Sequence, residues 1–450
     1  MKLHEVFRLS EPCRVAVVGA GGKTSTIWRL AESLTGKVVV TTTTHLGVDQ
    51  VARADKCIYI SSDGELLEID WGNLPRATSI TGRVVDGQRL AGLTPAQIQK
   101  LLARAAELDI SVLVEADGAR GLPLKAPAAH EPVIPAGMDA VIVAAGLSGL
   151  GQPLDETNVF RAERFGELSG IPRGEIVTPE AAAGVLIHAE GGLKGIPDGT
   201  RRVLFLNQLD MLADRSQAMR IANLCKKTYD TVIIGSAGYQ NSEPHAAARV
   251  EKVACIILAA GGSSRFHGKP KARLVFDGQP LVVRAIQTGR AADMDEIVVV
   301  SGHGAEELAQ VLKGDSQVRL AHNPDWQQGQ ATSIKAGLRE LAANPAGRSN
   351  AVIFMLVDQP FVTPDLLRKL IETHQTGLAP IAAPIVGDAR ANPVLFDRVT
   401  FAELMGLQGD TGGRAIMGHF PHTWLPWLDD RILLDIDTPE DLERCQRELR

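Results

Sequence analysis

Residues 254–271 read ACIILAAGGSSRFHGKPK, and this stretch decides the fold of the C-terminal half of the chain. Its apolar run, residues 255–258, is typical of a strand buried in a parallel sheet. The following residues have almost no side-chain bulk, so their backbone can approach a ligand and offer successive N–H groups to an anion. We expect a nucleoside triphosphate at the end of this strand, although a glycine-rich turn with solvated basic residues is the alternative. The residues expected to hold it are Ala259, Ala260, Gly261, Gly262, Ser263, Arg265, Lys269 and Lys271.

The composition bounds the kind of protein. A chain of 450 residues is expected to form two or three domains, at roughly 150 residues each. Since 47 Lys and Arg face 53 Asp and Glu, we expect no nucleic-acid or membrane partner. Five scattered cysteines without a C-x-x-C pair argue against disulfides or zinc and fit a reducing cytosol. The N-terminal residues do not resemble a signal peptide, so the sequence predicts a cytoplasmic protein.

A second phosphate-binding loop is predicted near the N-terminus. A short apolar strand, residues 15–18, runs into GAGGKTST and then into an amphipathic helix pattern. Strand, glycine-rich loop and helix are the context of a P-loop, in which the backbone and the lysine hold phosphates and the threonine holds Mg²⁺. Val17 stands where the first glycine of the full Walker spacing would be, and the shorter form resembles the loop of the Mur ligases. The residues assigned to this loop are Gly19, Gly21, Gly22, Lys23, Thr24 and Ser25.

Two carboxylates follow a later strand of the N-terminal half. Glu115 and Asp117 come after the apolar residues 112–114, which is the position of a Walker-B metal ligand. Both are candidate Mg²⁺ ligands together with Thr24, although Asp117 is also a common turn residue. Threonines 41–44 end another strand, where contact with phosphate and simple β-propensity are equal explanations.

Asn207 and Asp210 follow the strand at 203–206, and Ser236-Ala237 follow the strand at 232–234. This arrangement resembles the base-reading corner of GTPases, where the aspartate accepts hydrogen bonds from guanine. Gln208 stands where that corner usually has lysine. A turn asparagine and a helix-capping aspartate explain the same residues equally well.

The C-terminal half alternates strands and helices, which predicts a doubly wound parallel sheet with ligands at the carboxyl ends of its strands. Gly329 and Ser333 open a helix and are candidates for the nucleotide pocket. Asp358 directly follows the apolar strand at 351–357, where a hard cation bridging phosphates would sit. Asp435 or Asp437 is expected to supply a second metal carboxylate, and the sequence does not decide between them.

The order Leu-Ala-Ala-Gly-x-Ser-x-Arg, then Gly278 to Leu281, then Asp358-Gln359-Pro360, resembles the molybdenum cofactor cytidylyltransferases. The resemblance implies Mg²⁺-dependent transfer of a nucleotidyl group from CTP to the phosphate of a molybdopterin-type cofactor. Arg265, Lys271 and Asp358 would be catalytic, with Lys271 favoured over Lys269 for the family's lysine. The resemblance also assigns Arg390, Asp410 and Arg414 to the acceptor substrate, with Ala391 standing where glycine is usual.

GAGGKTST, TTTTH and EADGARG, with the proline-rich residues 119–135, are similar to the selenium-dependent hydroxylase accessory proteins. This similarity covers residues 10–240 and implies a molybdenum hydroxylase apoenzyme as a partner. The sequence thus predicts two three-layer α/β domains, a P-loop-like domain at 1–240 and a Rossmann-like nucleotidyltransferase domain at 253–450, joined by a linker at 241–252. Three functions compete: a cytidylyltransferase fused to an accessory NTPase, a nucleotidyltransferase for another phosphorylated acceptor, and a nucleotide-switched assembly factor.

Overall fold

The computed structural model describes residues 2–449 except 239–243, 263, 267–268 and 345–348. The chain divides into two compact units, Met1–Val250 and Glu251–Arg450, here called the N-domain and the C-domain. Each is an α/β domain with its own hydrophobic core. Among the described residues, no helix is long and apolar enough to cross a membrane.

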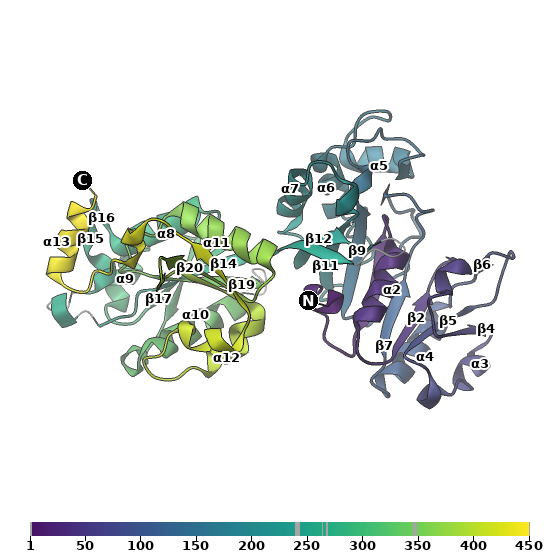
Figure 1. Ribbon diagram of the computed structural model, residues 1–450, viewed down its shortest axis with the longest axis horizontal. Helices are drawn as coiled ribbons and strands as arrows, with labels where there is room; N and C mark the ends of the chain where they lie inside the picture. Colours follow the sequence, from purple (N-terminus) through teal and green to yellow (C-terminus); the bar gives the residue numbers. More distant parts are fainter. Residues whose placement is uncertain (1, 239–243, 263, 267–268, 345–348, 450) are drawn as a thin grey trace. The chain divides into compact units, whose positions relative to one another are not determined.

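The N-domain is built on a nine-stranded sheet, ordered β13-β12-β11-β9-β1-β7-β2-β5-β4 (Figure 1). Its strands are β1 (Arg14–Gly19), β2 (Val38–Thr42), β4 (Lys56–Ile60), β5 (Ala77–Gly82), β7 (Ser111–Glu115), β9 (Ala140–Gly146), β11 (Arg201–Asn207), β12 (Thr231–Ser236) and β13 (His245–Val250). Two short ladders pair β3 (Leu46–Gly47) with β6 (Arg89–Leu90) and β8 (Leu124–Lys125) with β10 (Val159–Phe160). All pairs of the large sheet are parallel except β12 with β13.

Helices cover both faces of this sheet. They are α1 (Leu3–Val6), α2 (Lys23–Ser33), α3 (Asp63–Leu67), α4 (Pro95–Ala106), α5 (Ala162–Ser169), α6 (Pro179–Ile187) and α7 (Ser216–Cys225). Successive residues of β1 point to opposite faces of the sheet. Val15 and Val17 share one core with α1 and α2, and Ala16 and Val18 share the core on the other face with α4, α6 and α7. This is the three-layer arrangement predicted from the sequence.

The predicted linker at 241–252 needs correction. Six of its residues form β13, which pairs antiparallel with β12 and closes the N-domain sheet, so the domain boundary lies between Val250 and Glu251. The segment HAAARV is rich in alanine, which has little strand propensity of its own. Its strand conformation comes from pairing with the free edge of β12, a tertiary contact that local pattern does not reveal.

The C-domain sheet is ordered β18-β17-β14-β19-β22-β20-β21, with β23 added beside β20. Its strands are β14 (Val253–Leu258), β17 (Glu296–Ser301), β18 (Val318–His322), β19 (Ala351–Leu356), β20 (Ile381–Val386), β21 (Ala389–Arg390), β22 (Val394–Asp397) and β23 (His422–Pro426). A small hairpin pairs β15 (Val275–Phe276) with β16 (Gln279–Pro280). The strand of the opening stretch, β14, is central and completely buried between β17 and β19.

The sequence predicted a parallel sheet for this domain, and the structure corrects this, because the C-domain sheet is mixed. β22 runs antiparallel to both β19 and β20. The reason is the short connection from β20 to β22, residues 387–393, since a parallel pair needs a crossover of about a dozen residues or more.

The C-domain helices are α8 (Leu281–Ala291), α9 (Ala305–Val311), α10 (Gln330–Ala342), α11 (Pro364–Gly377), α12 (Phe401–Gly406) and α13 (Pro439–Arg447). α8 and α11 cover one face of the sheet and α10 and α12 the other (Figure 1). The predicted start of α13 is confirmed, because Thr438 caps it by accepting from the Asp441 N–H and Pro439 stands in its first turn.

Candidate functional site

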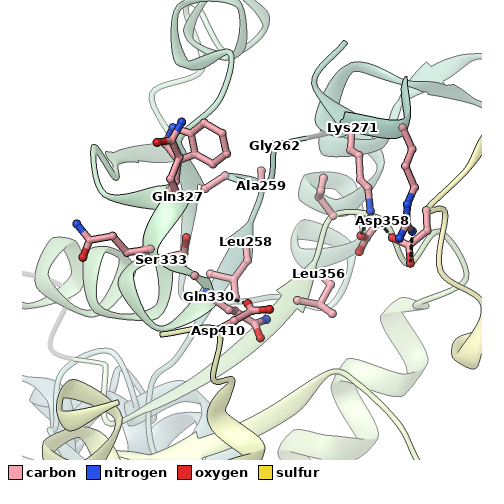
Figure 2. Close-up of a pocket in the computed structure, with 18 residues that line it drawn as sticks. Leu258, Ala259, Gly262, Lys271, Gln327, Gln330, Ser333, Leu356, Asp358 and Asp410 are labelled. Atoms are coloured by element: carbon pink, nitrogen blue, oxygen red, sulfur yellow. Dashed lines mark hydrogen bonds and ion pairs between the residues drawn. The ribbon is translucent and has the colours of Figure 1, made fainter. Parts of the chain in front are cut away.

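A cavity of about 800 Å³ opens at the carboxyl ends of β14 and β19. Residues 259–262, which follow β14, line it, and the backbone N–H groups of Ala260, Gly261 and Gly262 donate no hydrogen bond to the described residues. Lys271 and Asp358 lie on one side of the loop, and Gln327, Ser333 and Asp410 lie on the other (Figure 2). The sequence-predicted residues that line this cavity are Ala259, Ala260, Gly261, Gly262, Arg265, Lys271, Gly329, Ser333, Asp358, Asp410 and Asp437.

An ammonium held between two carboxylates forms the charged side of the cavity. Lys271 Nζ donates to Asp358 Oδ2 at 2.9 Å and to Asp437 Oδ1 at 2.5 Å. Burial of Lys271 favours its neutral form, but the Asp358 and Asp437 carboxylates outweigh burial and hold the pKa of Lys271 above its usual value. Arg265 lies 3.9 Å from Asp437 and its side chain is mostly exposed. Four charges of both signs therefore converge beside the glycine-rich loop.

Asp435 and Asp437 have different surroundings. Asp437 lines the cavity, whereas Asp435 Oδ1 accepts a hydrogen bond from Gln359 Nε2 at 2.7 Å. Burial raises the pKa of Asp435, and the nearby carboxylates Asp358 and Asp437 add to this increase. Asp437 is thus the one of the two that shares a cation with Asp358. Among the described residues no group of three or more His, Cys, Asp or Glu side chains gathers as a metal cluster.

The opposite side of the cavity contains residues that the sequence did not single out. Trp326, Gln327 and Gln328 form a 3-10 turn after β18, and all three line the cavity. A side chain at Gly262 would meet the Trp326 ring at 2.5 Å, so the loop and the ring are in close contact. No spacing signal marks this turn, because it reaches the cavity through the order of β18, β17 and β14 in the sheet.

Gly329 and Asp410 bring two distant loops together. Gly329 has a φ of +107°, and a side chain there would overlap the backbone of Gly409 and Asp410. Asp410 Oδ1 accepts from the Gln330 N–H at 3.3 Å. Asp410, assigned to the acceptor by resemblance, therefore lies on the same cavity as the glycine-rich loop after β14. Ser333 accepts from Asn323 Nδ2 at 2.9 Å and is buried.

Arg390 and Arg414, the other two residues assigned to the acceptor, are not among the cavity's lining residues. Arg390 lies over the Trp424 ring, 5.5 Å from its centre. Burial lowers the pKa of Arg414 and the positive charge of Arg390 adds to this effect, while Asp435 opposes it. The charges of Arg390 and Asp435 therefore both act on the Arg414 guanidinium. Lys269 is exposed and does not line the cavity, and Ser263 lies outside the described residues.

The N-domain loop between β1 and α2 is shaped by three glycines. Gly19, Gly21 and Gly22 all have positive φ, and a side chain at Gly22 would lie 2.6 Å from Asn207 Nδ2. The backbone N–H groups of residues 22–25, which include Lys23, Thr24 and Ser25, donate no hydrogen bond to the described residues. These free donors stand at the N-terminus of the eleven-residue helix α2.

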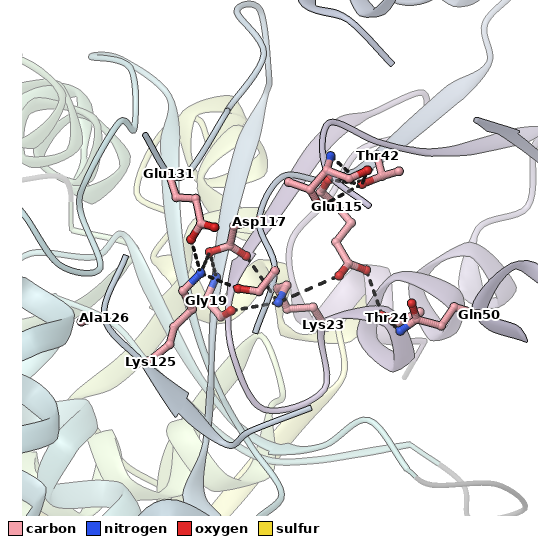
Figure 3. A network of polar contacts seen from close by, with 12 residues as sticks. Gly19, Lys23, Thr24, Thr42, Gln50, Glu115, Asp117, Lys125, Ala126 and Glu131 are labelled. Carbon is pink, nitrogen blue, oxygen red and sulfur yellow. Dashed lines mark hydrogen bonds and ion pairs between the residues drawn. The ribbon is translucent and has the colours of Figure 1, made fainter. Parts of the chain in front are cut away.

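Lys23 lies between two carboxylates in the same way as Lys271 (Figure 3). Its Nζ donates to Gly19 O at 2.9 Å and lies 3.3 Å from Asp117 Oδ1 and 3.9 Å from Glu115 Oε1. Thr24 Oγ1 donates to Glu115 Oε2 at 2.9 Å and accepts from Gln50 Nε2 at 3.0 Å. Burial raises the pKa of Glu115 and the ammonium of Lys23 opposes this increase.

Asp117 differs from Glu115 because it faces two lysines. Asp117 Oδ2 accepts from the Gly19 N–H at 3.0 Å and from Lys125 Nζ at 2.7 Å. Its Oδ1 is buried and accepts no hydrogen bond from the described residues. Lys125 also donates to Glu131. Arg161 donates two further hydrogen bonds to the Glu131 carboxylate, at 2.9 and 3.0 Å. A chain of alternating charges thus runs from the glycine-rich loop into the proline-rich segment 119–135.

Asn207 and Asp210 reach the same edge of the N-domain sheet. Asn207 Nδ2 donates to Gly21 O at 2.6 Å, and its Oδ1 accepts from the Ala237 N–H at 2.8 Å. The Asp210 N–H donates to Ser236 Oγ at 3.2 Å, and the Ser236 hydroxyl donates to Asp210 Oδ1. The structure therefore brings the two motifs, Asn-x-x-Asp and Ser-Ala, into one corner beside the glycine-rich loop.

Comparison with known proteins defines the class of each half. A family model described as "MobA-like NTP transferase domain" matches residues 255–423. Molybdenum cofactor cytidylyltransferase of Escherichia coli (strain K12) is 28% identical over 187 residues, which cover 42% of this chain and 92% of that protein. Nicotine blue oxidoreductase of Paenarthrobacter nicotinovorans is 29% identical over 202 residues, which cover 43% of this chain and 94% of that protein. The C-terminal half is a nucleotidyltransferase.

A family model described as "YqeC protein" matches residues 15–163. "Uncharacterized protein YqeC" of Escherichia coli (strain K12) is 34% identical over 200 residues, which cover 44% of this chain and 76% of that protein. This chain belongs to the YqeC family and carries a MobA-like NTP transferase domain in its C-terminal half. Of the resemblances inferred from the motifs, the two that cover whole domains are thereby confirmed: the one to the molybdenum cofactor cytidylyltransferases in the C-terminal half and the one to the selenium-dependent hydroxylase accessory (YqeC-like) proteins in the N-terminal half.

Proposed function

We propose that the C-domain transfers the CMP group of CTP to the phosphate of a molybdopterin-type cofactor. The observation that carries this proposal is the placement of Lys271, Asp358 and Asp437 on the cavity lined by residues 260–262, whose N–H groups donate no hydrogen bond to the described residues. These groups fit a triphosphate, because backbone donors and ammonium neutralise phosphate oxygens while carboxylates hold a bridging cation. CTP as the donor rests on the similarity to the cytidylyltransferase and on the Leu-Ala-Ala-Gly sequence at 258–261.

The chemistry proposed is a displacement at phosphorus. An oxygen of the acceptor's phosphate attacks the α-phosphorus of CTP, a new P–O bond forms, and the bond to the bridging oxygen of the β-phosphate breaks, which releases pyrophosphate. Because the attacking phosphate is already anionic, positioning and charge neutralisation are sufficient without a strong general base. Lys271 and Arg265 are the cations available for the departing pyrophosphate.

A divalent cation fits the residues of the cavity. Asp358 and Asp437 already share one positive charge, the Lys271 ammonium, so their oxygens converge on a single point. Carboxylate oxygens with phosphate oxygens are the donor set that Mg²⁺ and Mn²⁺ prefer. When bound, such a cation supplies charge neutralisation to the triphosphate. Lys271 would then turn from the carboxylates to the phosphates.

The acceptor side is proposed at Arg390 and Arg414. Their guanidinium groups, one of which feels the charge of the other, match a phosphate monoester, which Arg binds through paired hydrogen bonds. Neither side chain lines the cavity, which leaves the cavity free for CTP. A sugar phosphate or polyol phosphate carries the same group, so it is the alternative acceptor.

Pyrophosphate release from CTP with and without molybdenum cofactor tests this function. We expect release only when the cofactor is present, and slower release with GTP or ATP. Release with a sugar phosphate and none with molybdenum cofactor would transfer the proposal to the alternative acceptor. Turnover of CTP by Asp358→Ala at the wild-type rate would contradict the metal site.

We also propose that the N-domain binds a second nucleoside triphosphate on the loop between β1 and α2. It is supported by the free N–H groups of residues 22–25, by the buried Lys23 and by the oxygen donors Thr24 and Glu115, which fit a hard cation. The Oδ1 of Asp117 is buried and faces Lys23 Nζ at 3.3 Å, so the ammonium is held beside the loop by a second carboxylate.

In this proposal the N-domain uses its nucleotide to assist the maturation of a molybdenum hydroxylase, to which the C-domain's product would be delivered. The variant Lys23→Ala separates the two activities. It should keep cytidylyl transfer, because Lys23 belongs to the other compact unit, and should lose maturation of the hydroxylase in a reconstituted assay. Full maturation by Lys23→Ala would contradict the role of the N-domain nucleotide.

A further inference from the structure

We propose that the nucleotide of the N-domain is a guanine nucleotide, whose base is bound by the carboxylate of Asp210. This inference rests on the proposed nucleotide function of the N-domain. It starts from the corner formed by Asn207, Asp210 and Ser236, which phosphate binding alone does not use.

The corner lies at a suitable distance from the phosphate loop. β11, which ends at Asn207, is separated from β1 by the single strand β9, so the two strands are about 10 Å apart. A ribose with its 5′-phosphate spans such a gap. Asn207 fixes the separation, since its amide bridges Gly21 O of the phosphate loop and the Ala237 N–H of the next strand's end. Asn207 is buried, so this bridge is part of the rigid scaffold.

Asp210 is held in one orientation while part of it stays available. Ser236 Oγ accepts a hydrogen bond from the Asp210 N–H, and the Ser236 hydroxyl donates one to Asp210 Oδ1. Ser236 is buried, whereas Asp210 is exposed, and Asp210 Oδ2 accepts no hydrogen bond from the described residues. A carboxylate accepts only, and it has lone pairs on both oxygens for a ligand with two parallel N–H groups.

Among the common nucleobases, guanine alone presents two neighbouring donors on its pairing edge, N1–H and the 2-amino group. Adenine and cytosine each place an acceptor beside their amino group, and uracil places its single N–H between two carbonyl oxygens. A fixed carboxylate would therefore favour guanine and leave an unfavourable oxygen–oxygen contact with the others. The Gln208 side chain is directed toward Ser148, because its Oε1 accepts a hydrogen bond from Ser148 Oγ at 2.7 Å.

The variant Asp210→Asn tests the inference, because it replaces one acceptor with a donor. Xanthine differs from guanine in having a carbonyl where guanine has the 2-amino group, so an asparagine amide complements xanthine. Binding of GTP, ATP, CTP and XTP is measured by calorimetry on the full chain carrying Asp358→Ala, which weakens the C-domain site. Only the binding that Lys23→Ala abolishes is assigned to the N-domain.

We expect GTP to bind the N-domain about 10- to 100-fold more tightly than ATP. Asp210→Asn should weaken GTP by a similar factor and strengthen XTP, a gain that loss of a structural contact does not produce. ATP or CTP binding as tightly as GTP, or no gain for XTP, would overturn the guanine inference and leave phosphate binding intact. Absence of any Lys23-dependent binding would instead refute the proposed nucleotide function of the N-domain.

Discussion

Replacing Lys271 with methionine removes the cation that the structure places between Asp358 and Asp437. The side chain is 18% exposed, and its Nζ makes one contact of 2.9 Å and one of 2.5 Å with these carboxylates. Methionine keeps much of the length of the side chain, so the change is mainly one of charge. The two carboxylates would then repel each other until another cation neutralises them.

The size of the effect follows from the two contacts. A hydrogen bond to a charged group contributes about 1.5–3 kcal/mol, so a metal ion competing with Lys271 must overcome at least about 3 kcal/mol. Without that competition, Lys271→Met should bind Mn²⁺ about 100-fold more tightly than the wild-type chain in the absence of nucleotide. The same variant should lose about 10²- to 10³-fold in kcat, because a cation facing the departing pyrophosphate is missing.

Paramagnetic resonance of free Mn²⁺ measures the first effect, and pyrophosphate release measures the second. Lys269→Met is the matched control, since Lys269 is exposed and outside the cavity, and both variants keep the N-domain site unchanged. The reasoning is refuted if Lys271→Met binds Mn²⁺ no better than the control. A large loss of kcat in Lys269→Met alone would give the catalytic role to Lys269.

Three further outcomes are expected. Although burial opposes it, the hydrogen bonds from Arg161 and Lys125 lower the pKa of Glu131 from 4.5 to about 2. The ionised Glu131 carboxylate therefore stabilises the folded state fully above about pH 4.5, and this contribution is lost as the pH falls towards 2. Glu131→Gln should lower the free energy of unfolding by about 2–3 kcal/mol at pH 7 and by little at pH 2. Hydrogen exchange of the β8 amides measures the difference. Gly329→Ala should raise the KM for CTP at least about tenfold, since the new side chain meets the loop at 409–410, whereas Gly418→Ala, with open space around it, should not. Arg414→Met should raise the KM for the pterin acceptor about tenfold and leave the KM for CTP unchanged, as measured from initial rates. An equal rise in the two KM values would argue against an acceptor role for Arg414.

The sequence predicted the features that depend on local pattern. β14 and β19 were recognisable because both are continuous apolar runs, and Asp358 was recognisable because it directly follows one of them. The two glycine-rich loops follow strands in the same way. Parallel strands place their carboxyl ends at one edge of a sheet. Within each domain, the loop and the carboxylates that follow its strands could therefore be expected to lie close together from the sequence alone.

The sequence did not predict features that depend on strand order and on pairing. Trp326 and the glutamines after it reach the cavity only because β18 lies two strands from β14. The choice of Asp437 over Asp435 depends on which side chain turns toward Lys271, and no spacing encodes that turn. β13 and the antiparallel β22 depend on a free strand edge and on a short connection, respectively.

The central claim is that the C-domain transfers a nucleotidyl group from CTP to a pterin phosphate at the cavity beside Asp358. The most direct measurement is pyrophosphate release by the full chain with CTP, Mg²⁺ and molybdenum cofactor, with mass spectrometry of the pterin product. We predict release of pyrophosphate only when molybdenum cofactor is present, together with an equal amount of the pterin cytosine dinucleotide. Asp358→Ala should form neither product. Pyrophosphate without the dinucleotide, or an active Asp358→Ala, would contradict the account.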